Sequence, residues 1–355
     1  MNHSVSACTL VAITALCQVD AALAQDLSMR PIVPFLEGTD VFVSSDHDVR
    51  FEAAIFPHLV AWQNFDTLLD ARVKESDRHI FWVISGTPAV RLKMFQSESA
   101  PVRTPSYMPR GGVQLIYSVD YKCGAAGQVL KRTNGVPECG ESKPRQRPSV
   151  SLWEFHGFVG HHSNGQDGCL YEEQSRPEGG GPCEPSFAGA AQPGVVNKKD
   201  GSFSTNYVRA GVNWRRNWLG PVTADVAETV REVTISGEYQ RQFHSDRDQE
   251  PFYSKNRGAL AFSAAQAQMV RFCGARFSEA VGASVLLDRP VTTNSRLAVW
   301  AQVSCFPDVR GGWGFFVRAY SGQDYYNLGF LEDINQVQIG ITFNQDGFFR
   351  FRPPR

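Results

Sequence analysis

The sequence predicts an all-β protein: a single antiparallel transmembrane β-barrel of about twelve strands. Three observations predict this fold. Stretches of about ten residues alternate between apolar and strongly polar side chains, as in a strand with one face toward lipid and the other toward a polar interior. Aromatic residues gather at the ends of these stretches, and helical periodicity is nearly absent.

Three stretches show the alternation most clearly. Residues 113–121 alternate Val, Leu, Tyr, Val and Tyr with Gln, Ile, Ser and Asp. Residues 232–240 place Val, Ile, Gly and Tyr between Glu, Thr, Ser, Glu and Gln, and residues 336–344 repeat the pattern. A single stretch of this kind also occurs in soluble sandwiches, where the apolar face packs on a core. A soluble β-sandwich therefore stays the alternative.

Further strands are expected at residues 49–60, 79–85, 89–96, 150–163, 203–216, 258–272, 282–287, 297–305 and 313–321. Two long connections interrupt them. Residues 121–147 are basic toward their end, and the Gly-, Pro- and Glu-rich residues 165–201 form the longest loop. No internal repeat or linker indicates a second domain, so residues 25–355 are expected to form one barrel domain.

Residues 1–24 are predicted to be a signal peptide, with an apolar run over residues 7–16 and Ala22-Leu23-Ala24 before Gln25. After that point no segment is apolar over the roughly 20 residues that a membrane helix needs. The net charge of -1 implies no broad attraction to nucleic acid, and no nucleic-acid partner is expected. The sequence therefore predicts an exported protein.

The cysteines predict disulfides. Two of the 8 cysteines, Cys8 and Cys17, lie in the predicted signal peptide, and an even number remains. An even number in an exported chain favours disulfides, and the spacings fit no zinc pattern. Proximity in the sequence suggests the pairs Cys123–Cys139 and Cys169–Cys183, which leaves Cys273–Cys305.

The candidate site begins with His161 and Ser163. Alternate side chains of a strand share a face, so these two point the same way and the imidazole can take the hydroxyl proton. This is the base and nucleophile pair of a serine hydrolase. The side chain of Asn206 can accept a hydrogen bond from the imidazole and fix its tautomer.

Alternation also predicts which way this site faces. His161 and Ser163 share a face with Trp153, Phe155 and Val159. Asn206 shares a face of the next strand with apolar residues at positions 208, 210, 212 and 214. If the apolar faces meet lipid, all three polar side chains lie on the outside of the barrel. Polar groups are costly there and tend to be functional, so the substrate is expected to be a lipid within the membrane.

At this point the chain resembles the outer-membrane phospholipase A family, whose strands bear His-x-Ser-Asn-Gly and, after a loop, Ser-x-Ser-x-Asn. These motifs correspond here to residues 161–165 and 202–206. Residues 99–109 resemble the second outer loop of the family, and residues 319–322 and 335–343 resemble its last two strands. The resemblance thus extends from about residue 99 to 349 and is specific for the motifs as a set.

The resemblance implies a calcium-dependent phospholipase A of the bacterial outer membrane, with A1, A2 and lysophospholipase activity. It implies Ser163 as nucleophile, His161 as base and acid, Asn206 as the residue that orients His161, and the Gly165 amide in the oxyanion hole. The implied Ca²⁺ ligands are the Gln166 carbonyl, the Ser202 hydroxyl and Ser99 of the partner subunit, all hard oxygen donors. It also implies outer-membrane phospholipid as substrate and a reversible, active homodimer.

Some features depart from the family. The insertion between the motifs is unusually long, and no clear counterpart exists for the glutamine of the family's dimer face. Two other functions stay open. A lipid A deacylase also carries a His-x-Ser pair on a barrel exterior, but its third member is a carboxylate and its chain is much shorter. A non-catalytic pore or structural barrel is the other alternative.

Overall fold

The structure is a computed structural model that describes a large part of the chain beyond the predicted signal peptide. The described residues are 35, 37–45, 49–63, 78–95, 105–119, 130–133, 136–139, 149–172, 174–175, 177, 183, 195, 197, 201–223, 226–243, 254–267, 276–288, 295–307, 312–324, 333–344 and 350–351. The predicted signal peptide, Ser99, Cys123 and Cys273 lie outside them. No helix among the described residues is long and apolar enough to cross a membrane.

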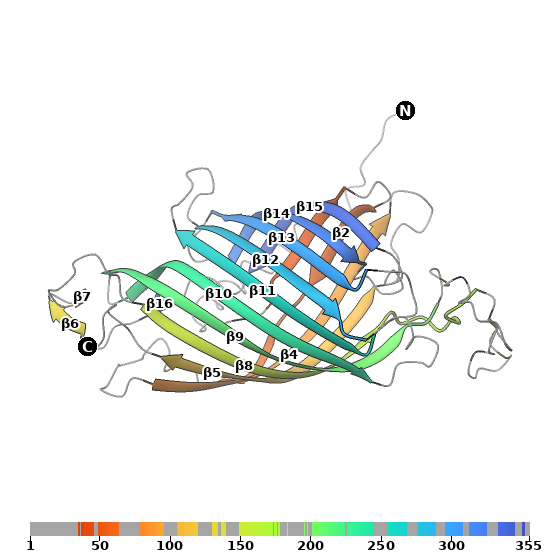
Figure 1. Cartoon of the computed structure of the whole chain (residues 1–355), viewed down its shortest axis with the longest axis horizontal. Helices are drawn as coiled ribbons and strands as arrows, with labels where there is room; N and C mark the ends of the chain where they lie inside the picture. The colour runs from red at the N-terminus through yellow and green to blue at the C-terminus, as the bar shows by residue number, and fades with distance from the viewer. Residues whose placement is uncertain are drawn as a thin grey trace, which may run out of the picture.

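Among the described strands, 12 pair antiparallel into one closed ring, which confirms the predicted barrel (Figure 1). Around the ring these are β1 (Thr39–Ser44), β2 (Val49–Ile55), β4 (Arg78–Phe95), β5 (Ser106–Val119), β8 (Ser149–Ser163), β9 (Ser204–Thr223), β10 (Val226–Phe243), β11 (Asn256–Ala267), β12 (Arg276–Leu286), β13 (Leu297–Phe306), β14 (Gly312–Gln323) and β15 (Asp333–Asn344). β15 pairs with β1 and closes the ring.

Four of the described strands are short and lie outside the ring. β3 (Leu59–Gln63) pairs with β4, and β16 (Arg350–Phe351) pairs with β10. β6 (Leu130–Thr133) and β7 (Val136–Cys139) form a separate hairpin at the left of Figure 1, within the long connection between β5 and β8.

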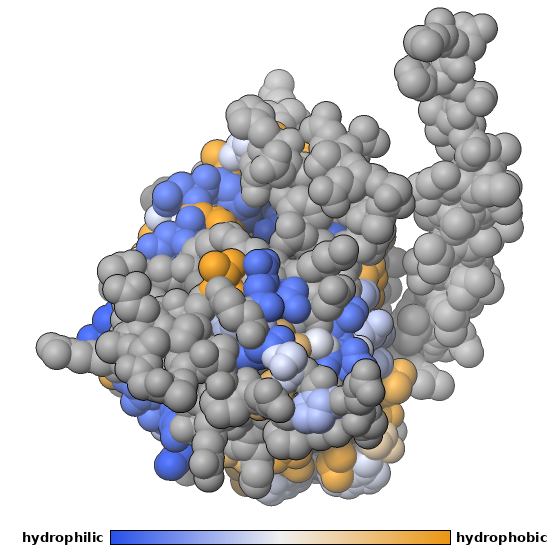
Figure 2. Space-filling model, turned by 90° about the vertical axis from the view of Figure 1, so that its right-hand side faces the viewer, coloured by the Kyte–Doolittle hydropathy of each residue, from blue (hydrophilic) through white to orange (hydrophobic). Residues whose placement is uncertain are grey.

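Apolar side chains face outward on the ring. In β15, Val337 and Ile339 are 46% and 57% exposed, whereas the intervening Gln336 and Gln338 are 6% and 0% exposed. Figure 2, an end view of the barrel, shows hydrophilic residues gathered toward the middle and apolar residues along the lower edge. This inside-out arrangement is that of a membrane barrel. The soluble sandwich is therefore excluded.

One part of the described wall differs from the strands that the sequence predicts. Residues 79–85 and 89–96 were expected as two strands, but β4 is continuous. Residues 49–60 were expected as one strand, but β2 and β3 are separated by residues 56–58, which include Pro57. β2 pairs with β4 from Val90 onward and β3 pairs up to Gly86. Pro88 thus faces the gap on that side, where its missing N–H leaves no partner unsatisfied.

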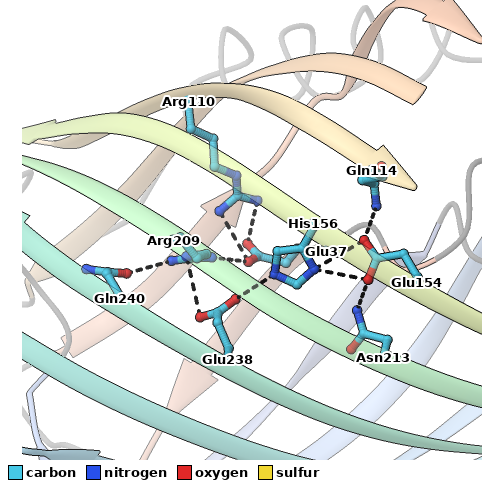
Figure 3. Close-up of polar contacts among 9 residues, drawn as sticks. All are labelled: Glu37, Arg110, Gln114, Glu154, His156, Arg209, Asn213, Glu238 and Gln240. Carbon is cyan, nitrogen blue, oxygen red and sulfur yellow. Dashed lines mark hydrogen bonds and ion pairs between the residues drawn. The ribbon is translucent and has the colours of Figure 1, made fainter. Parts of the chain in front are cut away.

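A polar network fills part of the barrel interior (Figure 3). The Glu154 carboxylate, fully buried, accepts hydrogen bonds from Gln114 at 3.0 Å and from Asn213, and pairs with His156 at 3.0 Å. The Arg209 guanidinium lies 3.4 Å from Glu238 and donates to Gln240 at 3.0 Å. These residues come from β5, β8, β9 and β10, so the network ties together four neighbouring strands. His156 lies on the non-lipid face of β8 and points into the barrel.

The segment before β1 runs through this interior. Glu37 pairs with Arg110 of β5 and with Arg209 of β9, each at 3.0 Å, although β2 and β4 separate β1 from β5 in the ring. The Glu37 carbonyl lies 2.8 Å from His58 Nε2, and the Phe35 ring lies 4.3 Å from the Arg215 guanidinium carbon. These contacts place Phe35 and Glu37 inside the lumen.

Candidate active site

The candidate site lies where β8 ends and β9 begins, at the right-hand end of Figure 1. On β8, Phe155 and Val159 are 50% and 61% exposed, while Glu154 and His162 are buried. The alternation of a strand then places His161 and Ser163 on the outer face.

β9 brings Asn206 to His161. The two residues lie directly opposite each other in the β8–β9 register, and His161 Nδ1 is 2.8 Å from Asn206 Oδ1. An amide oxygen can only accept, so Nδ1 carries the proton and donates it to the hydrogen bond. In the neutral imidazole this leaves the lone pair on Nε2, the nitrogen that a general base uses in this arrangement.

Ser163 is the last residue of β8 and is flanked on both sides. In the register its partners are Tyr107 on β5 and Ser204 on β9. The described residues include no hydrogen bond between Ser163 Oγ and His161. Contacts between catalytic groups are often long without substrate and tighten when the substrate binds. His161 and Ser163 therefore share one face at the end of β8.

The turn after Ser163 depends on a glycine. Gly165 has φ +68°, a left-handed conformation that costs other residues about 1–2 kcal/mol. A Cβ on Gly165 would lie 3.5 Å from the ring of Tyr107, so this turn runs close beside the partner of Ser163 on β5. Gly165 therefore lies at the end of β8 where Ser163 is located.

Two of the three predicted calcium ligands lie on facing segments. Gly168 and Gly201 form an isolated parallel bridge, and the Ser202 amide donates to the Gly168 carbonyl at 2.8 Å. This places the segment with Gln166 beside the segment with Ser202. A carbonyl and a hydroxyl are neutral, hard oxygen donors, so the donor set fits calcium. Within the described chain no group of three or more His, Cys, Asp or Glu residues could hold a metal ion.

A disulfide joins Cys169 to Cys183, as predicted, at the root of the long insertion. Beside it, the Asn197 backbone amide donates to the Leu170 carbonyl at 2.8 Å, and the Glu172 backbone amide donates to the Val195 carbonyl at 2.9 Å. Cys305 is also in a disulfide, whereas its expected partner Cys273 and the pair Cys123–Cys139 cannot be placed because Cys273 and Cys123 lie outside the described residues.

The role of Asn164 could not be predicted from the sequence, in which Asn164 is one residue of the motif at 161–165. Its side chain is 2% exposed and bonds to residues on both sides of the insertion. The one signal available was its place between a nucleophile and a glycine, which does not reveal a partner 37 residues away.

The fold and the site together define a class: a closed β-barrel with an apolar exterior that carries a serine, a histidine and an asparagine on outward-facing positions at one end. No protein-family profile and no curated protein matches the sequence. Solved structures do match.

The backbone is similar to outer membrane phospholipase A from Escherichia coli, with 9% identity, coverage of 89% of this chain and 95% of that chain, and a TM-score of 0.44. It is also similar to the Salmonella typhi outer membrane phospholipase dimer with bound calcium, with 9% identity, coverage of 90% and 94%, and a TM-score of 0.42. OmpT of Vibrio cholerae is more distant, with 8% identity, coverage of 86% and 94%, and a TM-score of 0.23. At these identities the likeness concerns the fold alone.

Proposed function

We propose that this protein is a calcium-dependent phospholipase A of the bacterial outer membrane, which hydrolyses acyl esters of glycerophospholipids. One observation carries the proposal. The 2.8 Å hydrogen bond between His161 and Asn206 lies beside Ser163 on the outer, lipid-facing wall of the barrel. Polar side chains that face lipid are costly and tend to be functional, and an ester in the surrounding lipid can reach this pair from the side.

The residues divide the chemistry among them. Ser163 Oγ attacks the acyl carbonyl carbon while His161 Nε2 takes its proton, and the Gly165 amide donates to the oxygen that becomes negative. The carbon–oxygen bond to the glycerol then breaks, and His161 returns the proton to the leaving oxygen. A water, deprotonated by His161, hydrolyses the acyl-serine and restores the hydroxyl. Asn206 holds the imidazole throughout.

The asparagine in this triad is neutral, so it orients His161 without supplying a negative charge. Calcium, when bound, polarises the ester carbonyl and offsets the negative charge that develops on its oxygen. The residues proposed to hold it are Gln166, through its carbonyl, Ser202, through its hydroxyl, and Ser99 of the partner subunit. The last ligand makes the site depend on a reversible homodimer, which is part of the same proposal.

The two alternatives fit the site less well. A lipid A deacylase requires a carboxylate as third member, but here an amide is the partner of His161. A pore requires an open lumen, whereas Glu37, Arg110 and Arg209 meet inside this one. The interior network therefore favours a barrel whose function is on its outer surface.

The test is fatty-acid release from phosphatidylcholine in detergent micelles, with Ca²⁺ or with chelator, by purified and by crosslinked protein. Ser163→Ala is expected to lower kcat by about 1000-fold or more, because the nucleophile is lost. Ser204→Ala is the matched control, since Ser204 lies directly opposite Ser163 on β9 and should retain most activity. Equal release by the Ser163→Ala variant and wild type would remove Ser163 as nucleophile. No release by crosslinked wild type in calcium would refute the phospholipase.

A further inference from the structure

The Asn164 side chain joins the two halves of the candidate site. Asn164 Nδ2 donates to the Gly201 carbonyl at 2.6 Å, and Asn164 Oδ1 accepts from the Phe203 amide at 3.0 Å and from the Gln166 amide at 3.3 Å. The Asn164 amide itself donates to the Phe203 carbonyl at 3.1 Å. One residue thus holds the turn after the nucleophile against the segment that leads into β9.

The Asn164 side chain lies in a region that is buried from solvent. Asn164 is 2% exposed, and the neighbouring Gly201 and Phe203 are buried. Phe203, 1% exposed, packs edge-on against the ring of His162 with 4.7 Å between the ring centres. Buried backbone groups need partners, and here the Gly201 carbonyl and the Phe203 amide obtain them from one side chain. No water can replace it without entering this packed region.

The residues that Asn164 holds are those with proposed roles. Gly165 and Gln166 follow it directly, and Ser202 lies between its two partners Gly201 and Phe203. A shift of the turn relative to β9 would move the Gly165 amide away from the ester oxygen and separate Gln166 from Ser202. Displacements of about 1 Å at such a site can cost about 100-fold in rate.

We infer that Asn164 is the positioning residue of this site, a side chain that fixes the oxyanion turn and the Ser202 segment in register without touching the substrate. The inference rests on the proposed phospholipase function. The inference also concerns the long insertion. Residues 164 and 203 are 39 apart in the sequence, and the Asn164 side chain joins the two ends of that insertion.

The experiment compares three variants by kcat and KM on phosphatidylcholine micelles with Ca²⁺, and by hydrogen exchange of the Gln166 and Phe203 amides. Asn164→Ala removes all three side-chain bonds. Asn164→Asp keeps the two accepted bonds and loses only the donor to Gly201. Asn213→Ala is the matched control, because Asn213 is also a buried asparagine but bonds to Glu154 on the inner face.

We expect Asn164→Ala to lower kcat by about 100-fold with KM within about 3-fold of wild type, and to speed exchange of both amides. Asn164→Asp should recover about 10-fold of that loss and keep both amides protected. Asn213→Ala should lower stability and leave the turnover of folded molecules unchanged, since no group of the site moves.

Three results overturn the inference. If wild type is active and Asn164→Ala is equally active, the proposed phospholipase function stands but Asn164 has no positioning role. A loss of turnover in Asn213→Ala equal to that in Asn164→Ala reduces the effect to general destabilisation. If Asn164→Ala does not fold, Asn164→Asp decides, and a kcat equal to wild type refutes the positioning role. Absence of activity in wild type is the distinct failure, because it refutes the proposed function and the inference with it.

Discussion

Asn206 occupies the position at which many serine hydrolases have a carboxylate. Its oxygen accepts from His161 Nδ1 at 2.8 Å and selects the tautomer with a free Nε2. An amide carries no charge, so its contribution is that of one neutral hydrogen bond, about 0.5–1.5 kcal/mol. The residue therefore orients the base and leaves the electrostatic stabilisation of the transition state to other groups.

Substitution of Asn206 should separate orientation from charge. Asn206→Ala removes the hydrogen bond, and we expect kcat on phosphatidylcholine to fall by about 10-fold, which corresponds to about 1.4 kcal/mol. Asn206→Asp keeps an acceptor for Nδ1, and its kcat should exceed that of the alanine variant. Steady-state kinetics at saturating Ca²⁺ measure both. A kcat for Asn206→Ala equal to that of wild type would mean that the hydrogen bond has no part in catalysis.

The β8–β9 pair is the element that carries the site. Its register runs without a shift from Ser149 opposite Trp218 to Ser163 opposite Ser204, so one ladder presents His161 to Asn206. The two faces of the pair serve different purposes. The outer face carries the candidate triad, and the inner face carries Glu154 and His156 of the lumen network.

Gly160 shows how closely that inner face is packed. A Cβ there would lie 2.4 Å from Tyr207 Cζ, and Tyr207 is only 4% exposed. Gly160→Ala must therefore displace a buried ring, and we expect it to lower the free energy of unfolding by about 1–3 kcal/mol. A Cβ on Gly157, which lies on the outer face of the same strand, would have no neighbour within 4 Å.

Gly157→Ala is consequently the control, with an expected stability close to that of wild type. Urea titrations of protein folded into lipid vesicles would give both values. If the two alanine variants were equally stable, the Tyr207 ring would have room to move, and the inner face would be less tightly packed than these contacts indicate.

At the scale of the whole molecule, the lumen is crossed by the segment before β1. Glu37 lies between Arg110 and Arg209, and its side chain keeps 43% of its surface exposed within the lumen. Water therefore reaches the carboxylate, but the chain itself lies across the path. The described residues just before β1 thus lie inside the barrel.

Removal of the Glu37 carboxylate should loosen the attachment of the residues before β1 to the barrel interior. We expect Glu37→Ala to conduct ions more often in planar bilayers than wild type, because Arg110 and Arg209 lose the carboxylate that joins them. Glu279→Gln is the control, since Glu279 lies exposed on β12 and outside the network of Figure 3. Conductance of Glu37→Ala that matches both wild type and this control would show that the segment stays in place without the carboxylate.

Several features of the fold and the site could be predicted because they are local. The period of a strand fixes which side chains share a face, so alternation alone placed His161, Ser163 and Asn206 on the outer wall. The same alternation indicated strands on either side of each polar loop. The errors fell at Pro57 and Pro88, because the effect of a proline depends on whether a neighbouring strand needs its missing N–H.

What the sequence by itself determined is therefore the kind of fold, the inward or outward direction of each strand residue, and the residue types available for chemistry. Only the tertiary structure decided that His161 lies opposite Asn206, that Asn164 bonds to Gly201 and Phe203, and that Glu37 reaches Arg110 and Arg209. The reason is physical. The side of a strand on which each side chain lies follows from backbone geometry within a few residues. Register, ring closure and contacts across the lumen depend instead on which distant segments meet when the whole barrel closes.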